Sequence, residues 1–182
     1  KYLNSPESEI FEKGKMLFAF EKASSDIRKR DKAIIVEGYF DVISLHSKGI
    51  TNSVASLGTA LNKYQISQLC RCTDNKNIIL NFDSDNAGIL ATKRVIKEVE
   101  TLSLHDQINL KILQLSHFKD PDEYLNSHTP EDYFNLIDNS SFWIDWEIDQ
   151  IFKDQDLTKS EIFQSVISSL VKLLSKLPQS ST

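Results

Sequence analysis

Short apolar runs alternate with amphipathic segments along most of the chain, and this alternation limits the possible folds more than any other feature. The runs at residues 33–36 and 78–82 are continuous and rich in β-branched residues, as expected of strands buried on both faces. Further strands are predicted at residues 52–55 and 110–115, with helices at 40–48, 62–72 and 87–102. Alternating strands and helices predict an α/β fold in which helices flank a parallel sheet.

The two ends of the chain show other patterns. Residues 10–23 carry spaced apolar side chains and predict a helix, whereas the polar residues 24–31 are typical of a linker. Beyond Pro121 the pattern is helical, with helices predicted at residues 131–137, 142–152 and 160–177. We therefore expect three parts: residues 1–31, which end a preceding subdomain and form a linker, residues 32–127, which form the α/β domain, and residues 128–182, which form part of a helical subdomain.

Composition excludes several classes of protein. The 182 residues contain no signal peptide and no apolar run near the ~20 residues that a membrane-spanning helix needs, so a cytoplasmic protein without a membrane partner is expected. Cys70 and Cys72 lack the further ligands of a zinc site. The first residue is Lys1 rather than Met, which indicates a piece of a longer protein. The net charge of −5 argues against binding of nucleic acid unless the acids serve a specific purpose.

Acidic residues follow three of the predicted strands at the point where each strand ends. The carboxyl ends of parallel strands lie along one edge of a sheet, and open sheets of this kind bind their ligands there. Acids that are distant in the sequence are therefore expected to meet at this edge. They are Glu37 and Asp41 after the first strand, Asp83 and Asp85 after the third, and Asp120, Asp122 and Glu123 after the last.

Several carboxylates in one place repel one another, and divalent cations relieve this repulsion. Hard oxygen ligands select Mg²⁺ or Mn²⁺, and two or more such ions suit phosphoryl chemistry. Taken singly, the acids also fit simpler purposes: Asp85 can cap the helix that follows it, Asp41 can interact with a helix dipole, and Glu37 can be a solvated residue. Only their combination at three strand ends favours a metal centre.

Six segments that contain or flank these acids form a recognisable set. VEGYFDV (36–42), DSDNAG (83–88) and KDPDE (119–123) resemble the glutamate, aspartate and later acidic motifs of the Toprim domain in bacterial DnaG-type DNA primases. The first two motifs also occur in topoisomerases and some nucleases. VASLGTAL (54–61), and KYLNSPE (1–7) followed by FEKG (11–14), are similar to flanking primase segments and make the resemblance specific to that family.

The resemblance implies a Toprim-type sheet followed by an all-helical subdomain, and an RNA polymerase activity that makes short RNA primers on single-stranded DNA from ribonucleoside triphosphates. It also implies Mg²⁺ or Mn²⁺ as cofactor. Glu37 would be a catalytic acid or base, or would orient metal-bound water. The chief metal ligands would be Asp83, Asp85 and Asp122, supported by Asp41 and Asp120, with Asp83 and Asp85 also catalytic.

The resemblance further places four residues near the incoming nucleotide: Lys1, Asn4, Lys13 and Tyr39. The chain departs from the family pattern at Ser84, where a Gly is common, at Asn86, where an Arg is usual, and at residues 116–118, where a Gly-containing segment is usual. We expect Ser84 to fit if its φ is negative, and residues 116–118 to stiffen their loop. Loss of the Arg is expected to weaken nucleotide or template binding.

Parts of the family's proteins are missing from these 182 residues. They are an N-terminal domain that carries zinc, most of a basic subdomain that holds the template, and a C-terminal domain that binds the replicative helicase. We expect the chain to be a monomer that binds metal and primes poorly by itself. Two alternatives stay open: another Toprim phosphodiester enzyme, such as a topoisomerase or nuclease, and a non-catalytic, metal-stabilised scaffold in a replication complex.

Overall fold

The computed structural model describes residues 6–9, 11–58, 60–102, 107–115 and 117–176. The chain divides into two compact units, Lys1–Ser140 and Ser141–Thr182. No helix in these described ranges has the length and apolar character that crossing a membrane requires.

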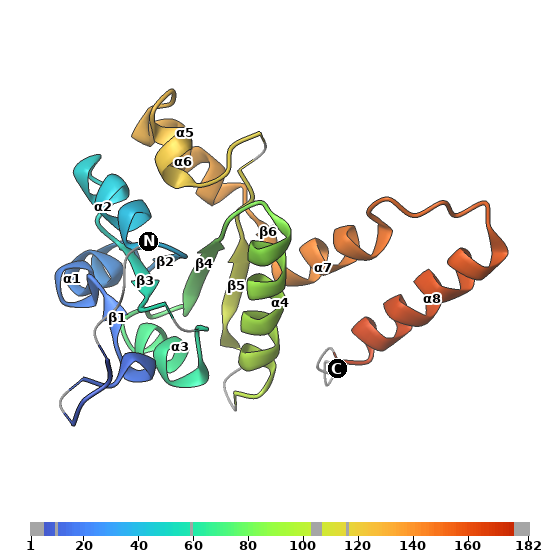
Figure 1. The fold of residues 1–182 in the computed structure, drawn as a ribbon, viewed down its shortest axis with the longest axis horizontal. Coiled ribbons are helices and arrows are strands. Elements are labelled where there is room, and N and C mark those ends of the chain that lie inside the picture. Colours follow the sequence, from blue (N-terminus) through green and yellow to red (C-terminus); the bar gives the residue numbers. More distant parts are fainter. Residues whose placement is uncertain (1–5, 10, 59, 103–106, 116, 177–182) are drawn as a thin grey trace. The chain divides into compact units, whose positions relative to one another are not determined.

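The first unit is built on a sheet whose four main strands are parallel (Figure 1). Strands β2 (Ala33–Val36), β3 (Ser53–Ser56), β4 (Asn77–Asn81) and β5 (Asn109–Ile112) confirm the four predicted strands. The order is β1-β3-β2-β4-β5, with β2 paired to both β3 and β4 in parallel. A short strand β1 (Leu17–Phe18) pairs with β3 in the antiparallel direction, so the sheet is mixed.

Four helices of the first unit begin after a residue whose side chain caps them. The α3 helix (Lys63–Cys70) starts after Asn62, whose side chain accepts hydrogen bonds from the Tyr64 and Gln65 amides. Side chains of the preceding residue also cap α4 (Asn86–Glu100), α5 (Pro121–Leu125) and α6 (Pro130–Asp138). Together with α2 (Tyr39–Ser47), these helices confirm those predicted between the strands and the first one predicted after Pro121.

The predicted structure of residues 10–31 is wrong. In place of a helix over 10–23 and a linker over 24–31, the chain forms a single 3₁₀ turn, η1 (Lys13–Lys15), then β1, then α1 (Phe20–Arg30). Ala19 takes a left-handed conformation with φ 62°, which separates the strand from the helix. The polar segment is helical because Ala23 and Ile27 are spaced one turn apart and are both fully buried.

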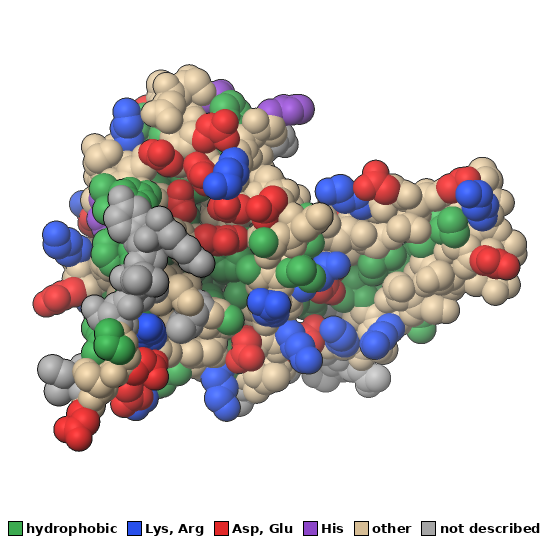
Figure 2. All heavy atoms as spheres, in the orientation of Figure 1, with side chains coloured by type: hydrophobic (Ala, Val, Ile, Leu, Met, Phe, Trp, Pro, Cys, Tyr) green, Lys and Arg blue, Asp and Glu red, His purple; other side chains and the backbone are tan. Residues whose placement is uncertain are grey.

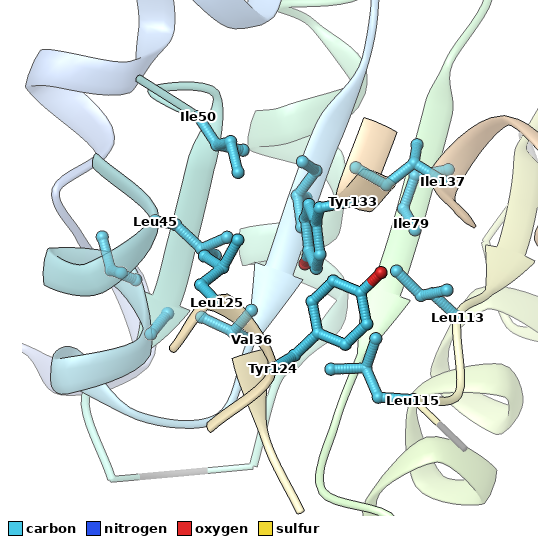
Figure 3. Packing of buried hydrophobic residues seen from close by; sticks show 13 residues of the cluster. Val36, Leu45, Ile50, Ile79, Leu113, Leu115, Tyr124, Leu125, Tyr133 and Ile137 are labelled. Carbon is cyan, nitrogen blue, oxygen red and sulfur yellow. The ribbon is translucent and has the colours of Figure 1, made fainter. Parts of the chain in front are cut away.

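Alternate residues of the strands face opposite sides of the sheet. Ile34, Val36 and Ile79 face one side, where they pack with residues of α2, α5 and α6 (Figure 3). Tyr133 of α6 is completely buried in this cluster, and its hydroxyl donates a 2.7 Å hydrogen bond to Oδ1 of Asn81. The Asn81 side chain in turn donates to the Leu113 carbonyl. This buried chain of hydrogen bonds ties α6 to the carboxyl end of β4.

The second unit contains a short strand β6 (Ser141–Phe142) and two helices, α7 (Trp143–Phe152) and α8 (Ser160–Leu174). The two helices contact each other, and Trp146, Val166 and Leu173 are buried. The division between the compact units falls after Ser140, later in the chain than the expected boundary at residues 127 and 128. The reason is that α6 places Tyr133 and Ile137 in the core of the first unit.

Candidate metal centre

Two neighbouring strands bring Glu37 and Asp83 together. Strands β2 and β4 pair in parallel with Val36 opposite Asn81, so the residues that follow them leave the sheet side by side. Oε1 of Glu37 accepts a hydrogen bond of 3.1 Å from the Asp83 amide. Glu37 is therefore anchored to the loop that begins with Asp83, although the two residues are 46 positions apart.

Close approach of a helix completes this corner of the site. Asp85 caps α4, and its Oδ1 accepts a 2.9 Å hydrogen bond from the Gly88 amide. A Cβ atom at Gly88 would lie 2.0 Å from the Asp83 carbonyl oxygen and 2.9 Å from Oε1 of Glu37. Only glycine allows the first turn of α4 to pack so close to these two acids.

Asp41 lies in the first turn of α2 and is 8% exposed. Its Oδ2 accepts a 2.9 Å hydrogen bond from the Gly38 amide, which precedes the helix. Burial, and after it the charges of Asp120, Asp83 and Asp122, raise the pKa of Asp41 to about 6, against the lowering effect of that hydrogen bond. The effect of three charges from other parts of the sequence on one carboxyl indicates that these acids share one region.

The loop after β5 delivers the last pair of acids. Asp120 caps α5, and its Oδ1 accepts a hydrogen bond of 2.9 Å from the Glu123 amide. Pro121 occupies the first helical position, where its missing N–H costs no hydrogen bond. Asp122 follows in the same first turn and is exposed. The sequence around Asp120 therefore fixes where this short helix begins and points its acidic end toward the site.

Lys119 is the cation of this cluster. Its Nζ lies 3.8 Å from Oδ2 of Asp83 and 3.8 Å from Oδ2 of Asp120, and the lysine side chain is 66% exposed. The charges of Asp83 and Asp120 raise the pKa of Lys119 above its ordinary value. A positive charge thus bridges acids from two different loops.

The pKa values of Glu37 and Asp83 are both raised. For Glu37 the causes are burial and then the charge of Asp83, which outweigh the hydrogen bond from the Asp83 amide. For Asp83 the main cause is burial, opposed by Lys119 and reinforced by Asp120 and Asp85. Half-buried carboxylates that repel one another are the arrangement that a divalent cation stabilises.

The donor set fits a hard cation that keeps much of its water. Figure 2 shows Asp and Glu side chains gathered on one face of the first unit, around a basic side chain. Among the described residues, no three His, Cys, Asp or Glu side chains are arranged to hold an ion directly. Mg²⁺ is commonly bound through one or two carboxylates, with waters and substrate phosphates as its other ligands. The carboxylate oxygens of this cluster suit that mode of binding.

The structure brings six of the predicted site residues into this region: Glu37, Asp41, Asp83, Asp85, Asp120 and Asp122. Tyr39 begins α2 beside them, and its ring lies 4.8 Å from that of Phe18. Lys13 lies in η1, where its carbonyl accepts a hydrogen bond from Gln65, so its place near a nucleotide stays a prediction. Lys1 and Asn4 lie outside the described residues.

Sequence reasoning missed two residues of the site. Lys119 and Gly88 were part of the quoted motifs, but neither was predicted to have a role. Lys119 had a signal, because it is the only Lys or Arg within residues 116–123 and directly precedes Asp120. The need for glycine at position 88 depends on a contact with Glu37 across the sheet edge, which a single sequence does not reveal.

Comparison with known proteins identifies the family. Residues 34–125 match the Toprim-like family model. The DNA primase of Synechococcus elongatus is 51% identical over 178 residues, which are 98% of this chain and 26% of the relative. The E. coli primase catalytic core superimposes with a TM-score of 0.81 at 30% identity, covering 98% of this chain and 56% of that one.

A DnaG primase catalytic domain bound to single-stranded DNA gives a TM-score of 0.82 at 28% identity, and the match covers all of this chain and 57% of that domain. The chain thus spans about a quarter (26%) of the length of its curated relative and somewhat over half (57%) of a primase catalytic domain. It belongs to the Toprim-like family and corresponds to the Toprim-bearing part of the DnaG-type primase catalytic core.

Proposed function

We propose that this chain is the part of a DNA primase that holds divalent metal and carries out nucleotidyl transfer during the synthesis of short RNA primers on single-stranded DNA. The observation that carries the proposal is the meeting of Glu37, the Asp83/Asp85 pair and the Asp120/Asp122 pair at one sheet edge. The similarity to DNA primases over nearly the whole chain supports the same reading.

Asp83, Asp85 and Asp122 would hold the metal, with Asp41 and Asp120 in support. The metal would be Mg²⁺ or Mn²⁺, and the site would bind two or more ions. A bound divalent cation supplies positive charge that stabilises the negative charge developing on phosphoryl oxygens. Apart from Asp41, these carboxylates come from two separate elements, loop 83–85 and the first turn of α5 with its capping residue Asp120. Lys119 lies between the same two elements and contributes a further positive charge.

Glu37 would hold or accept a proton during the reaction, or orient a water molecule at the site. Its carboxyl group is half-buried, its pKa is raised, and the hydrogen bond from the Asp83 amide fixes one of its oxygens. A carboxyl group whose pKa is raised toward the working pH is a better general base than a fully solvated one. Tyr39, Lys13, Lys1 and Asn4 would contact the incoming nucleotide.

The template and other partners follow from the primase assignment. One similar catalytic domain is described as bound to single-stranded DNA, which supports single-stranded DNA as the template here. The chain spans 26% of its curated relative, so zinc binding and the contact with the replicative helicase are proposed to belong to other parts of the protein. We propose that the protein acts in the cytoplasm and that the chain by itself is monomeric and primes weakly.

The test is ribonucleotide incorporation by the complete protein that contains this chain, on single-stranded DNA with Mg²⁺. We expect primers in the wild type and a loss of incorporation in Glu37→Gln, whose side chain can no longer carry the proton. Asp26→Asn is a matched control, because the Asp26 carboxylate accepts a hydrogen bond from the Thr51 hydroxyl and lies outside the acidic cluster. Full activity of Glu37→Gln would contradict the assigned role, and no incorporation by the wild type would contradict the function itself.

A further inference from the structure

Two loops carry the acids of the proposed metal centre. The aspartate loop, residues 83–85, follows β4 and contains Asp83 and Asp85. The second-acid loop, residues 117–120, lies between β5 and α5 and contains Lys119 and Asp120. These loops come from different strand ends, so the spacing of their acids depends on contacts that hold one loop against the other.

Ser84 makes several such contacts. Its amide donates a 3.2 Å hydrogen bond to the Lys119 carbonyl. Its hydroxyl lies 3.2 Å from the Phe118 carbonyl oxygen and 3.3 Å from that of Leu115, so its single hydrogen is shared between two acceptors. All three bonds run from the residue between the two aspartates to the segment that leads into Asp120.

The second-acid loop has a conformation that needs support. His117 adopts φ 68°, a left-handed conformation that favours glycine, and a residue with a Cβ keeps it only when the surrounding contacts fix it. The Ser84 hydroxyl bonds the carbonyl of the next residue, Phe118. The loop is thus held directly beside its strained position, by a side chain of the other acidic loop.

We propose that Ser84 is a positioning residue that fixes the second-acid loop against the aspartate loop and so sets the spacing between Asp83 and Asp120. Any residue except proline at position 84 can make the main-chain hydrogen bond to Lys119, whereas the hydroxyl hydrogen bonds need Ser or Thr. Because the hydroxyl hydrogen is directed at loop carbonyls, Ser84 acts through the acids rather than on a substrate. The proposal rests on the proposed function, since it assigns Ser84 a place in the same metal centre.

Three variants separate the hydroxyl from other effects. Ser84→Ala removes the hydroxyl and keeps the Cβ, while Ser84→Thr keeps the hydroxyl and serves as the conservative rescue. Ser47→Ala is the matched control, because the Ser47 hydroxyl also bonds a main-chain carbonyl, that of Ser44, but within α2. Each variant is compared with the wild type by amide hydrogen exchange without metal and by calorimetric titration with Mn²⁺.

In Ser84→Ala we expect faster exchange of the amides of residues 117–120 and Mn²⁺ binding weaker by about tenfold, the size of effect seen when residues that orient metal ligands are removed. Ser84→Thr and Ser47→Ala are expected to stay close to the wild type in both measurements. Exchange that is unchanged in Ser84→Ala would overturn the proposal, and so would faster exchange with an unchanged Mn²⁺ affinity.

The two measurements also distinguish this proposal from the proposed function. If the wild type binds no Mn²⁺, the metal centre and the spacing role of Ser84 within it both fail. If the wild type binds Mn²⁺ and Asp83→Asn/Asp85→Asn does not, the metal centre stands, and a Ser84→Ala variant that binds as tightly as the wild type removes the role of Ser84 alone.

Discussion

The two ends of the central strands hold carboxylates in opposite electrostatic surroundings. At the amino end, Asp31 accepts hydrogen bonds from the Asp74 and Asn75 amides and from the Asn75 and Asn77 side chains. Burial alone would raise the pKa of Asp31, but these hydrogen bonds lower it below its ordinary value. At the carboxyl end, Asp41 has a pKa raised to about 6 by burial and by other acids.

The difference separates a carboxylate that stabilises the fold from one that costs stability. Asp31 connects the end of α1 to the loop before β4, and its negative charge is satisfied within the protein. Asp41, Asp83 and Glu37 carry charges that the protein by itself satisfies poorly, because all three have raised pKa values. A cluster of acids that is held together at such a cost is expected to serve binding or catalysis.

The largest effect is expected from Asp83→Asn/Asp85→Asn in the complete protein. Primer synthesis should fall by a factor on the order of 10³, because the charges that hold the cation are lost. The isolated chain should unfold at the same or a higher temperature, since repulsion is relieved. Incorporation rates and thermal unfolding check the two parts, and a large fall in stability would show that the pair is structural, like Asp31.

Asp31→Asn should act in the opposite way and destabilise the chain by about 1–2 kcal/mol, because a neutral amide accepts fewer of the hydrogen bonds now made to the carboxylate. The contribution of Asp31 is present above the ordinary pKa of Asp and is lost as the pH falls through its lowered folded value. Urea unfolding at several pH values measures this, with Mn²⁺ affinity expected to be unchanged. Weaker Mn²⁺ binding in Asp31→Asn would remove the contrast between the carboxylates at the amino end and at the carboxyl end of the strands.

Asp41→Asn should stabilise the metal-free chain by about 1 kcal/mol at pH 7.5, because the cost of ionising a buried carboxyl disappears. The sign follows from the raised folded pKa: the wild type is destabilised as pH rises from about 3.8 to about 6, and the full cost remains above that range. The advantage of Asp41→Asn should therefore vanish near pH 4. Unfolding curves with a constant difference across this range would contradict the account.

The smallest effect is expected from Lys119→Gln. Without the ammonium group between Asp83 and Asp120, Mn²⁺ meets less competition, and binding should tighten by about threefold, in keeping with the weakness of exposed ion pairs. Lys111→Gln is the control, because Lys111 lies in β5 and its Nζ bonds the Asp138 carbonyl. Equal affinity in wild type and Lys119→Gln would mean that the lysine does not compete for the site.

The sequence predicted the parallel sheet because its signals were local. Continuous runs rich in β-branched residues predicted β2 and β4 to within one residue of their observed ends. The capping residues Asn62 and Asp85 lie at the start of two of the predicted helices. Residues 10–31 were misread because their outcome depends on the remote pairing of β1 with β3 and on the backbone of Ala19. Neither is visible in a pattern of apolar and polar residues.

The site was predictable in part for the same reason. Acids at three strand ends were visible in the sequence, and the topology of a parallel sheet implied that they meet. The bond between Glu37 and the Asp83 amide, the close approach of Gly88 and the bonds of Ser84 to residues 115–119 are contacts between separate loops. The sequence placed these residues in motifs, but it could not assign partners to them.

The most direct test of the account is paramagnetic broadening of amide NMR signals by Mn²⁺ added to this chain. The account predicts early broadening at Gly38, Ser84 and Lys119, around the acidic edge, while Asp74 and Asn75 beside Asp31 stay sharp. Broadening that begins around Asp31, or that is equal at the amino and carboxyl ends of the strands, would contradict the assignment of a divalent metal centre to the carboxyl end of the strands.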